Sequence, residues 1–214
     1  MLSLTEAQDI VQASAPNDYY RNVYRPAENT YLPRLCAWLE GFPPGRAVDV
    51  GPGWGTMLTW LTARGWRADC VDLMPPGHWI PPDTIGRLGI EFVQHDICSG
   101  PPPLEQGSYD LLLMGQVLGH VKFSPADCLR NVLCLLKPGG VGVVHVLDRD
   151  KAPIVSATQE WWELPAWGQG TPTELMNSTQ YSRESFAKLL ETVSSSENLW
   201  PDDGGPVIFG TCRP

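Results

Sequence analysis

The chain has 214 residues and carries a formal charge of −9, with 15 basic and 24 acidic side chains. Hydrophobic residues make up 43% of the chain and charged residues 18%, a balance that excludes a disordered chain or a long coiled coil. The acidic balance argues against nucleic acid as a partner, because a protein that follows a phosphate backbone needs a basic surface. We therefore expect a single folded domain.

Three features of the chain bear on its compartment. No apolar run approaches the roughly 20 residues that span a membrane, so we expect no membrane partner. Residues 1–12 have no basic residue and no long apolar stretch, unlike a secretory signal. The six cysteines contain no C-x-x-C pair, which predicts free thiols and no metal site. Together these features predict a cytoplasmic protein.

The first part of the chain predicts an N-terminal helical cap over residues 1–45. Ser3 and Glu6 have the spacing of a capping box, which starts a first helix. The tyrosine-rich residues 17–32 predict a partly helical segment. Apolar residues then recur at helical spacing, at Leu32, Leu35, Cys36 and Leu39. Pro33 is expected in the first turn of that helix, where proline is tolerated.

After this cap, short apolar segments alternate with helical patterns. Strands are predicted at 46–51, 67–73, 90–97, 109–115 and 141–147. Helices are predicted from Met57 to Gly65, from Ser124 to the KPGG segment at 137–140, and from Ser182 onward, with only a short helix among the prolines of 74–89. Residues 148–180 are irregular, and two segments around 201–205 predict a hairpin.

This alternation predicts an α/β fold. We expect a Rossmann-like, doubly wound, seven-stranded sheet that is mostly parallel and ends in a C-terminal antiparallel hairpin. The whole of 1–214 is predicted to be one domain, in which residues 148–180 form a lid insertion.

A glycine-rich turn follows the first predicted strand. Gly51, Gly53 and Gly55 let the backbone approach a ligand closely, and the next helix begins directly after them. Thr56 stands where a dinucleotide fingerprint needs its third glycine. Asp72, at the end of the second strand, can accept hydrogen bonds from both hydroxyls of a ribose. In this order the features predict a nucleotide-like ligand at the carboxyl ends of the strands.

In these residues the chain resembles the class I S-adenosylmethionine-dependent methyltransferases, over about residues 17–150. The family's first motif is similar to VDVGPGWG (48–55), and its fourth-strand motif is similar to YDLLLMGQVLGHV (109–121), of the small-molecule type. LLKPGGVGVVHV (135–146) resembles the turn into the fifth strand. The later residues depart from any single subfamily, so none is identified.

The resemblance implies S-adenosylmethionine as cofactor, S-adenosylhomocysteine as product, and no metal. The residues that it implies in cofactor binding are Asp49, Gly51, Gly53, Gly55, Asp72, Leu73, Met74, Asp96, Ile97 and Gln116. The glycines and Asp49 would lie at the methionine part, Asp72 at the ribose, and Gln116 at the sulfonium. Leu73 or Met74, Asp96 and the Ile97 backbone would contact the adenine. Loop hydrogen bonding is the alternative role for Asp49 and Gln116.

The acceptor side is expected in the segments that flank the family motifs. His120 is the candidate general base, because an imidazole titrates near neutral pH, and a structural role is its alternative. His145, inside the fifth strand, is expected to be a core residue. The candidate substrate-binding residues are Tyr20, Tyr24, Trp161, Trp162 and Trp167. The tryptophans could instead hold the lid to the sheet, and Glu160 or Glu163 could attract a cationic acceptor.

The predicted function is methyl transfer from S-adenosylmethionine to an oxygen or nitrogen of a small molecule, for example a secondary metabolite. One alternative is a protein methyltransferase, and another is a non-catalytic, methyltransferase-like regulatory subunit. An NAD-dependent enzyme is disfavoured by Thr56 and by the lack of a recognisable dehydrogenase Tyr/Lys pair. Neither the oligomeric state nor the acceptor is readable from the sequence.

Overall fold

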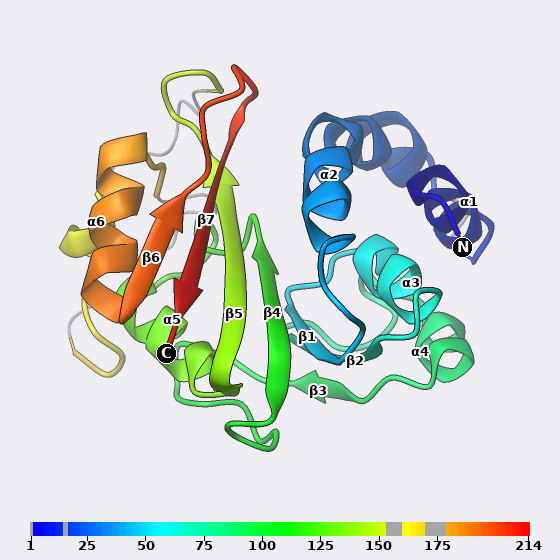
Figure 1. Cartoon of the computed structure of the whole chain (residues 1–214), viewed down its shortest axis with the longest axis horizontal. Coiled ribbons are helices and arrows are strands. Elements are labelled where there is room, and N and C mark those ends of the chain that lie inside the picture. The colour runs from blue at the N-terminus through cyan, green and yellow to red at the C-terminus, as the bar shows by residue number, and fades with distance from the viewer. Residues whose placement is uncertain (1, 15–16, 153–159, 170–178) are drawn as a thin grey trace. The chain divides into compact units, whose positions relative to one another are not determined.

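Figure 1 shows the computed structural model of the chain, which describes residues 2–14, 17–152, 160–169 and 179–214. Its strands are β1 (Arg46–Val50), β2 (Arg67–Asp72), β3 (Phe92–Gln94), β4 (Tyr109–Gly115), β5 (Leu136–Leu147), β6 (Ser196–Leu199) and β7 (Val207–Arg213). Its helices are α1 (Leu4–Ser14), η1 (Tyr20–Tyr24), α2 (Arg25–Leu39), α3 (Thr56–Thr62), α4 (Pro82–Leu88), α5 (Pro125–Leu133), η2 (Trp161–Glu163) and α6 (Arg183–Val193).

The seven strands form a sheet in the order β3-β2-β1-β4-β5-β7-β6. The pairs β1–β2, β2–β3 and β4–β5 are parallel, whereas β7 runs antiparallel to both β5 and β6. The predicted Rossmann-like sheet with its antiparallel C-terminal hairpin is therefore confirmed.

The chain divides into two compact units, which we call unit 1 (Met1–Gln94) and unit 2 (His95–Pro214). Unit 1 contains the elements from α1 to β3, and unit 2 contains those from β4 to β7. The assignment of 1–214 to one domain stays a prediction. None of the described helices is long and apolar enough to cross a membrane, and all six cysteines are free thiols.

The N-terminal helices of unit 1 differ from the predicted ones in their bounds. The capping box is present, since the Ser3 amide donates to Glu6 Oε2 (2.6 Å) and the Glu6 amide donates to Ser3 Oγ (3.2 Å). The π-helical η1 leads directly into α2, so that helix begins at Arg25 and Pro33 lies inside it rather than in its first turn. Pro26 takes the first-turn position, where a missing amide proton costs no helical hydrogen bond.

Strand β3 is shorter than predicted, because the chain turns at Asp96. The Cys98 amide donates to Asp96 Oδ1 (2.9 Å), and the Ser99 amide donates to the Asp96 carbonyl (2.9 Å). These bonds close a local turn, which ends the extended backbone at Gln94.

Strand β5 is longer than predicted and takes in the KPGG segment at 137–140. The register of its pairing with β4 shifts between Tyr109 and Leu111. Residues 137–140 therefore form a bulge in β5 instead of ending a helix. The preceding helix α5 has already ended at Leu133.

Helix α6 of unit 2 begins as the sequence predicts. Ser182 caps it, with its Oγ accepting from the Ser185 amide (3.1 Å) while the Ser182 amide donates to Ser185 Oγ (3.0 Å). The apolar face carries Phe186, Leu189 and Leu190, all fully buried. This face packs α6 against α5, β6 and β7.

Candidate active site

The glycine turn of unit 1 joins β1 to α3. Gly51, Gly53 and Gly55 have φ angles of 67°, 54° and 84°, in the left-handed region that favours glycine. A Cβ at Gly53 would lie 2.3 Å from Tyr24 Oη, and one at Gly55 would lie 2.9 Å from Ile80 Cδ1. The turn therefore needs glycine both for its backbone shape and for the close approach of neighbouring side chains.

Asp49, near the end of β1, is a buried carboxylate that is 6% exposed. Within the described residues no hydrogen bond or ion pair reaches its side chain, and its electrostatic neighbour is another acid, Asp72. Burial first, and then the charge of Asp72, raises the pKa of Asp49 to about 7. A buried acid without a partner needs either a proton or a ligand that donates to it, so Asp49 suits the ammonium group of a ligand.

Asp72 ends β2, and its carboxylate already holds the turn that follows. Its Oδ1 accepts from the Met74 amide at 2.8 Å. Burial raises the pKa of Asp72, although the backbone donors and His78 oppose this effect. The next residue, Leu73, is 59% exposed, which is unusual for a large apolar side chain. The carboxylate could accept hydrogen bonds from the hydroxyls of a ribose. The exposed apolar side chain could pack on the flat face of a base.

Asp96 and Ile97 lie in unit 2, in the loop after β3. Asp96 Oδ1 accepts from the Cys98 amide, and the Ile97 carbonyl accepts from Asn131 Nδ2 of α5 at 2.8 Å. Helix α5 therefore fixes the path of this loop. The adenine contacts expected of both residues stay predictions.

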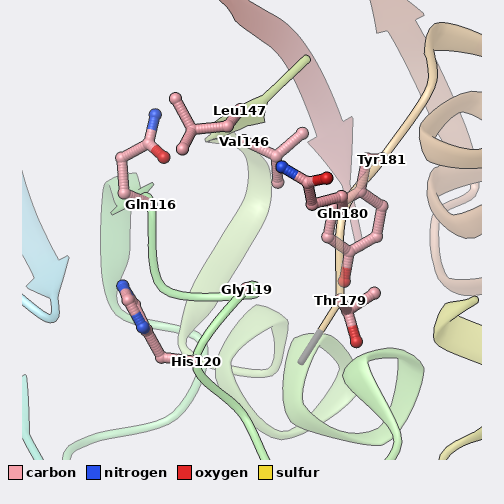
Figure 2. Close-up of a pocket in the computed structure, with 8 residues that line it drawn as sticks. All are labelled: Gln116, Gly119, His120, Val146, Leu147, Thr179, Gln180 and Tyr181. Carbon is pink, nitrogen blue, oxygen red and sulfur yellow. The ribbon is translucent and has the colours of Figure 1, made fainter. Parts of the chain in front are cut away.

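A small pocket of about 40 Å³ lies within unit 2 (Figure 2). It is lined by Gln116, Gly119, His120, Val146, Leu147, Thr179, Gln180 and Tyr181. Gln116 and His120 follow β4, and they face the segment 179–181 across the pocket (Figure 2). Among the described residues, the lining contains amide, hydroxyl and imidazole groups and no carboxylate, ammonium or guanidinium group.

Gln116 is held in an unusual backbone conformation at the end of β4. Its φ of 60° is the only left-handed value of a described non-glycine residue. The Gln116 amide donates to the His145 carbonyl at 2.9 Å, and its side-chain Nε2 lies 3.3 Å from His145 Nδ1. His145 is buried in β5, as expected of a core residue, and burial lowers its pKa to about 3. A neutral imidazole therefore orients the Gln116 side chain.

His120 contributes a second neutral imidazole, and this one lines the pocket. Its amide donates to the Val117 carbonyl at 2.8 Å, which fixes the turn after β4. Burial lowers the pKa of His120. The ring is therefore unprotonated at neutral pH and can accept a proton.

Tyr20 and Tyr24 lie in unit 1 at the glycine turn and its helix. Tyr20 Oη lies 3.1 Å from Thr56 Oγ1, and Tyr24 Oη occupies the space beside Gly53. These two residues were predicted to bind the acceptor. The structure places both beside residues predicted to bind the cofactor, and their contact with the acceptor stays a prediction.

The three tryptophans predicted to bind substrate do not line the pocket. Trp161 is buried and donates from Nε1 to the Ser185 carbonyl of α6 at 2.9 Å. Trp162 is half exposed and lies 5.1 Å from Lys188 Nζ of the same helix. The ring of Trp167 packs on Phe123, with 4.7 Å between centroids. This arrangement favours the alternative role, in which the tryptophans hold their segment to its neighbours.

Two carboxylates of the same segment already have partners in unit 2. Glu160 pairs with Arg149, and Glu163 Oε2 accepts from the Glu160 amide at 2.9 Å. Residues 153–159 and 170–178 of the predicted lid lie outside the described residues.

Sequence reasoning missed the pocket residues Thr179, Gln180 and Tyr181. Thr179 is 3% exposed, and its hydroxyl has no hydrogen-bond partner within the described residues. Gln180 Nε2 donates to the Ala152 carbonyl at 3.1 Å. Their sole sequence signal is a position just before the helix cap Ser182, which does not distinguish them from other loop residues. Across the described residues, no group of three or more His, Cys, Asp or Glu side chains could hold a metal ion.

A sheet of this strand order with a left-handed glycine turn after β1 is the architecture of a class I S-adenosylmethionine-dependent methyltransferase. Residues 21–193 match the family described as "Methyltransferase domain", and the chain belongs to that family.

Curated relatives match about half of the chain. An uncharacterized methyltransferase of Mycobacterium bovis is 30% identical over 121 residues, which are 55% of this chain and 46% of that protein. Ribosomal RNA small subunit methyltransferase C of Alcanivorax borkumensis is 27% identical over 104 residues, 46% of this chain and 31% of that protein. The chain thus spans less than half the length of these relatives.

Solved structures match nearly the whole chain. The DhpI–SAH complex has a TM-score of 0.63 at 20% identity, and the match covers 99% of this chain and 96% of that one. The 1,6-didemethyltoxoflavin-N1-methyltransferase of Burkholderia thailandensis, with bound 1,6-didemethyltoxoflavin and S-adenosylhomocysteine, has a TM-score of 0.59 at 16% identity, covering 100% and 92%. At these identities the likeness shows the shared fold.

Proposed function

We propose that the chain transfers the methyl group of S-adenosylmethionine to an oxygen or nitrogen of a small molecule. The observation that supports this proposal is the pocket of unit 2, whose lining combines the imidazole of His120, with its lowered pKa, and hydroxyl and amide side chains. The structural neighbour that acts on 1,6-didemethyltoxoflavin, a small molecule, supports it.

The residues of unit 1 fit the cofactor. Asp49 would hold its ammonium group, Asp72 its ribose hydroxyls, and Leu73 one face of its adenine. When bound, S-adenosylmethionine supplies a methyl carbon that its sulfonium already activates. The left-handed φ angles of the glycine turn support this assignment, because such a turn lets backbone amides approach a ligand closely.

In the pocket, the chain's own residues have to align the acceptor and remove its proton. His120 would accept the proton of a hydroxyl or N–H group as the acceptor's lone pair becomes the nucleophile. Gln116, oriented by His145, and Thr179, whose hydroxyl has no hydrogen-bond partner within the described residues, would hold the acceptor in place.

Calorimetric titration with S-adenosylmethionine, S-adenosylhomocysteine and NAD, in parallel, tests the cofactor. We expect both adenosyl sulfur compounds to bind and NAD not to bind. If none of the three compounds bound, this result would contradict the proposal and favour a non-catalytic subunit. Once binding is shown, transfer of radiolabelled methyl groups to small molecules, to peptides and to ribosomal RNA distinguishes the acceptor classes.

A matched pair of variants sharpens this titration. Asp72→Ala should weaken cofactor binding by about 1–3 kcal/mol, because the ribose hydroxyls lose a charged acceptor. Asp83→Ala removes an exposed carboxylate of α4 in the same unit and should leave the affinity unchanged. Equal affinities of the two variants would show that Asp72 does not hold the ribose.

A further inference from the structure

Four buried polar side chains from four different helices meet in unit 1. They are Gln8 of α1, Tyr20 of η1, Glu28 of α2 and Thr56 of α3, and each is at most 3% exposed. Glu28 is the single acid among them. No motif of the sequence drew attention to it, because it lies in the polar part of an N-terminal helix.

The hydrogen bonds of this group converge on the Glu28 carboxyl. Gln8 Nε2 donates to Glu28 Oε2 at 3.1 Å, and Tyr20 Oη donates to the same oxygen at 3.3 Å. Thr56 also hydrogen-bonds the Glu28 side chain. The Tyr20 hydroxyl in turn lies 3.1 Å from Thr56 Oγ1. The four side chains therefore form one connected network rather than separate contacts.

This network ends at the glycine turn. Thr56 is the first residue of α3 and follows Gly55 directly. Tyr24 precedes Glu28 by one helical turn, and its hydroxyl lies where a Cβ of Gly53 would be. A displacement of Glu28 would therefore reach the turn both through Thr56 and through Tyr24.

We propose that Glu28 is a positioning residue for cofactor binding, which fixes α1, η1 and α2 on the helix that follows the glycine turn. This inference rests on the proposed function, since it assigns a role at the same cofactor site. Glu28 acts through Thr56 and Tyr24 and makes no contact with the cofactor itself.

The charge of Glu28 gives the proposal a distinctive readout. Burial raises the pKa of Glu28 to about 7, against the opposing hydrogen bonds and the charge of Arg25. The other titratable groups that face it are Tyr20, Tyr24, Tyr31 and Cys36, and the pKa of each is raised by burial, so these groups stay neutral. Glu28 is then the group of this network that changes charge near neutral pH.

Ionised Glu28 accepts from all of its donors and also attracts a cation at the neighbouring glycine turn. Protonated Glu28 gains a donor on one oxygen and loses its negative charge, while Gln8 and Tyr20 can still donate to Oε2. Affinity for the cationic cofactor should therefore rise as pH increases through neutrality. Asp49 contributes a rise of the same sign, so the Glu28 part has to be separated by substitution.

Glu28→Gln tests the proposal in the full-length protein, because glutamine mimics the protonated acid at all pH values. Calorimetry should show equal affinities of wild type and variant for S-adenosylmethionine at pH 6. At pH 8 the variant should bind about three- to tenfold more weakly. Glu91→Gln makes the same change at an exposed site of unit 1 and should follow wild type throughout.

The proposal would be overturned if the cofactor affinity of Glu28→Gln had the same pH dependence as that of wild type. It would also be overturned if the variant lost thermal stability while this pH dependence stayed unchanged. If Glu28→Gln does not fold, Tyr20→Phe removes only the hydroxyl that joins Glu28 to Thr56 and should weaken binding about threefold. Wild-type affinity of Tyr20→Phe would also overturn the role of Glu28. If wild type itself does not bind S-adenosylmethionine, the proposed function fails first, which distinguishes the two failures.

Discussion

At the scale of single residues, the buried carboxylate of Asp49 affects both the proposed cofactor binding and the free energy of unfolding. Its pKa in the folded chain, about 7, lies above the ordinary value of 3.8, so the folded state binds more protons than the unfolded state between those values. The free energy of unfolding therefore falls as pH rises from about 4 to 7. A shift of this size corresponds to about 4 kcal/mol, which reflects the burial of the Asp49 charge and its repulsion by Asp72.

Asp49→Asn should therefore stabilise the free protein at pH 8 while it weakens cofactor binding. We expect a gain of about 1–3 kcal/mol in the free energy of unfolding, less than the full electrostatic term because the amide also lacks a partner. At pH 4 the gain should vanish, since Asp49 is then protonated. Urea unfolding at both pH values measures this, and a variant less stable than wild type at pH 8 would show that the Asp49 charge is satisfied.

The role of His120 is settled by separating turnover from binding. His120→Ala should lower kcat by about 10²–10⁴-fold if the ring removes the acceptor's proton, with cofactor affinity retained. Because burial lowers the pKa of His120, wild-type kcat/KM should decline only below the ordinary imidazole pKa of about 6.5. A fall of a few-fold, with an unchanged pH profile, would assign His120 a structural role.

At the scale of elements, the end of β4 depends on a single glycine. A Cβ at Gly115 would lie 2.2 Å from His145 Nε2 and 2.7 Å from its Cε1. His145 is buried between β4 and β7, pairing with Gly115 and Phe209, so its ring has little room to move. The ring also contacts the Gln116 side chain, which lines the pocket.

Gly115→Ala should therefore cost about 1–3 kcal/mol of stability, because it overpacks the interface between β4 and β5. Gly86→Ala is the matched control, since its Cβ would meet nothing within 4 Å. It lies inside α4, where alanine should add about 0.5–1 kcal/mol. Chemical unfolding of both variants checks this, and a Gly115→Ala protein as stable as wild type would mean that the strands adjust freely.

The elements also show where local patterns suffice. Helices α5 and α6 begin where predicted, at Ser124 and Ser182, because each start depends on a cap formed within one turn. Pro33 and the KPGG segment were misplaced, because their setting depends on more distant structure. A π-helical turn precedes α2 directly, and KPGG forms a bulge of β5 between residues that pair with Tyr109 and Leu111 of β4. Pairing and packing override local signals at both positions.

At the scale of the whole molecule, the residues predicted to bind the cofactor and the pocket residues differ in how well a sequence reveals them. Gly51, Asp72 and the later motifs follow in a fixed order, because each lies at the end of a strand that the sheet requires. Thr179 and Gln180 reach the pocket only through the path of an irregular segment. No periodicity encodes such a path, so a sequence pattern does not predict that these two residues line a pocket.

The two compact units make the single-domain prediction testable. If 1–214 fold as one domain, hydrogen exchange in increasing urea should show peptides of β1 and of β5 losing protection together. S-adenosylhomocysteine at about 100 times its dissociation constant should then raise the free energy of unfolding of both by about 2.7 kcal/mol. Two separate transitions, of which the ligand shifts only one, would mean that unit 1 and unit 2 fold independently. Ligand binding stabilises only the elements that unfold together with the binding site. This experiment therefore measures whether cofactor binding in one unit stabilises the other.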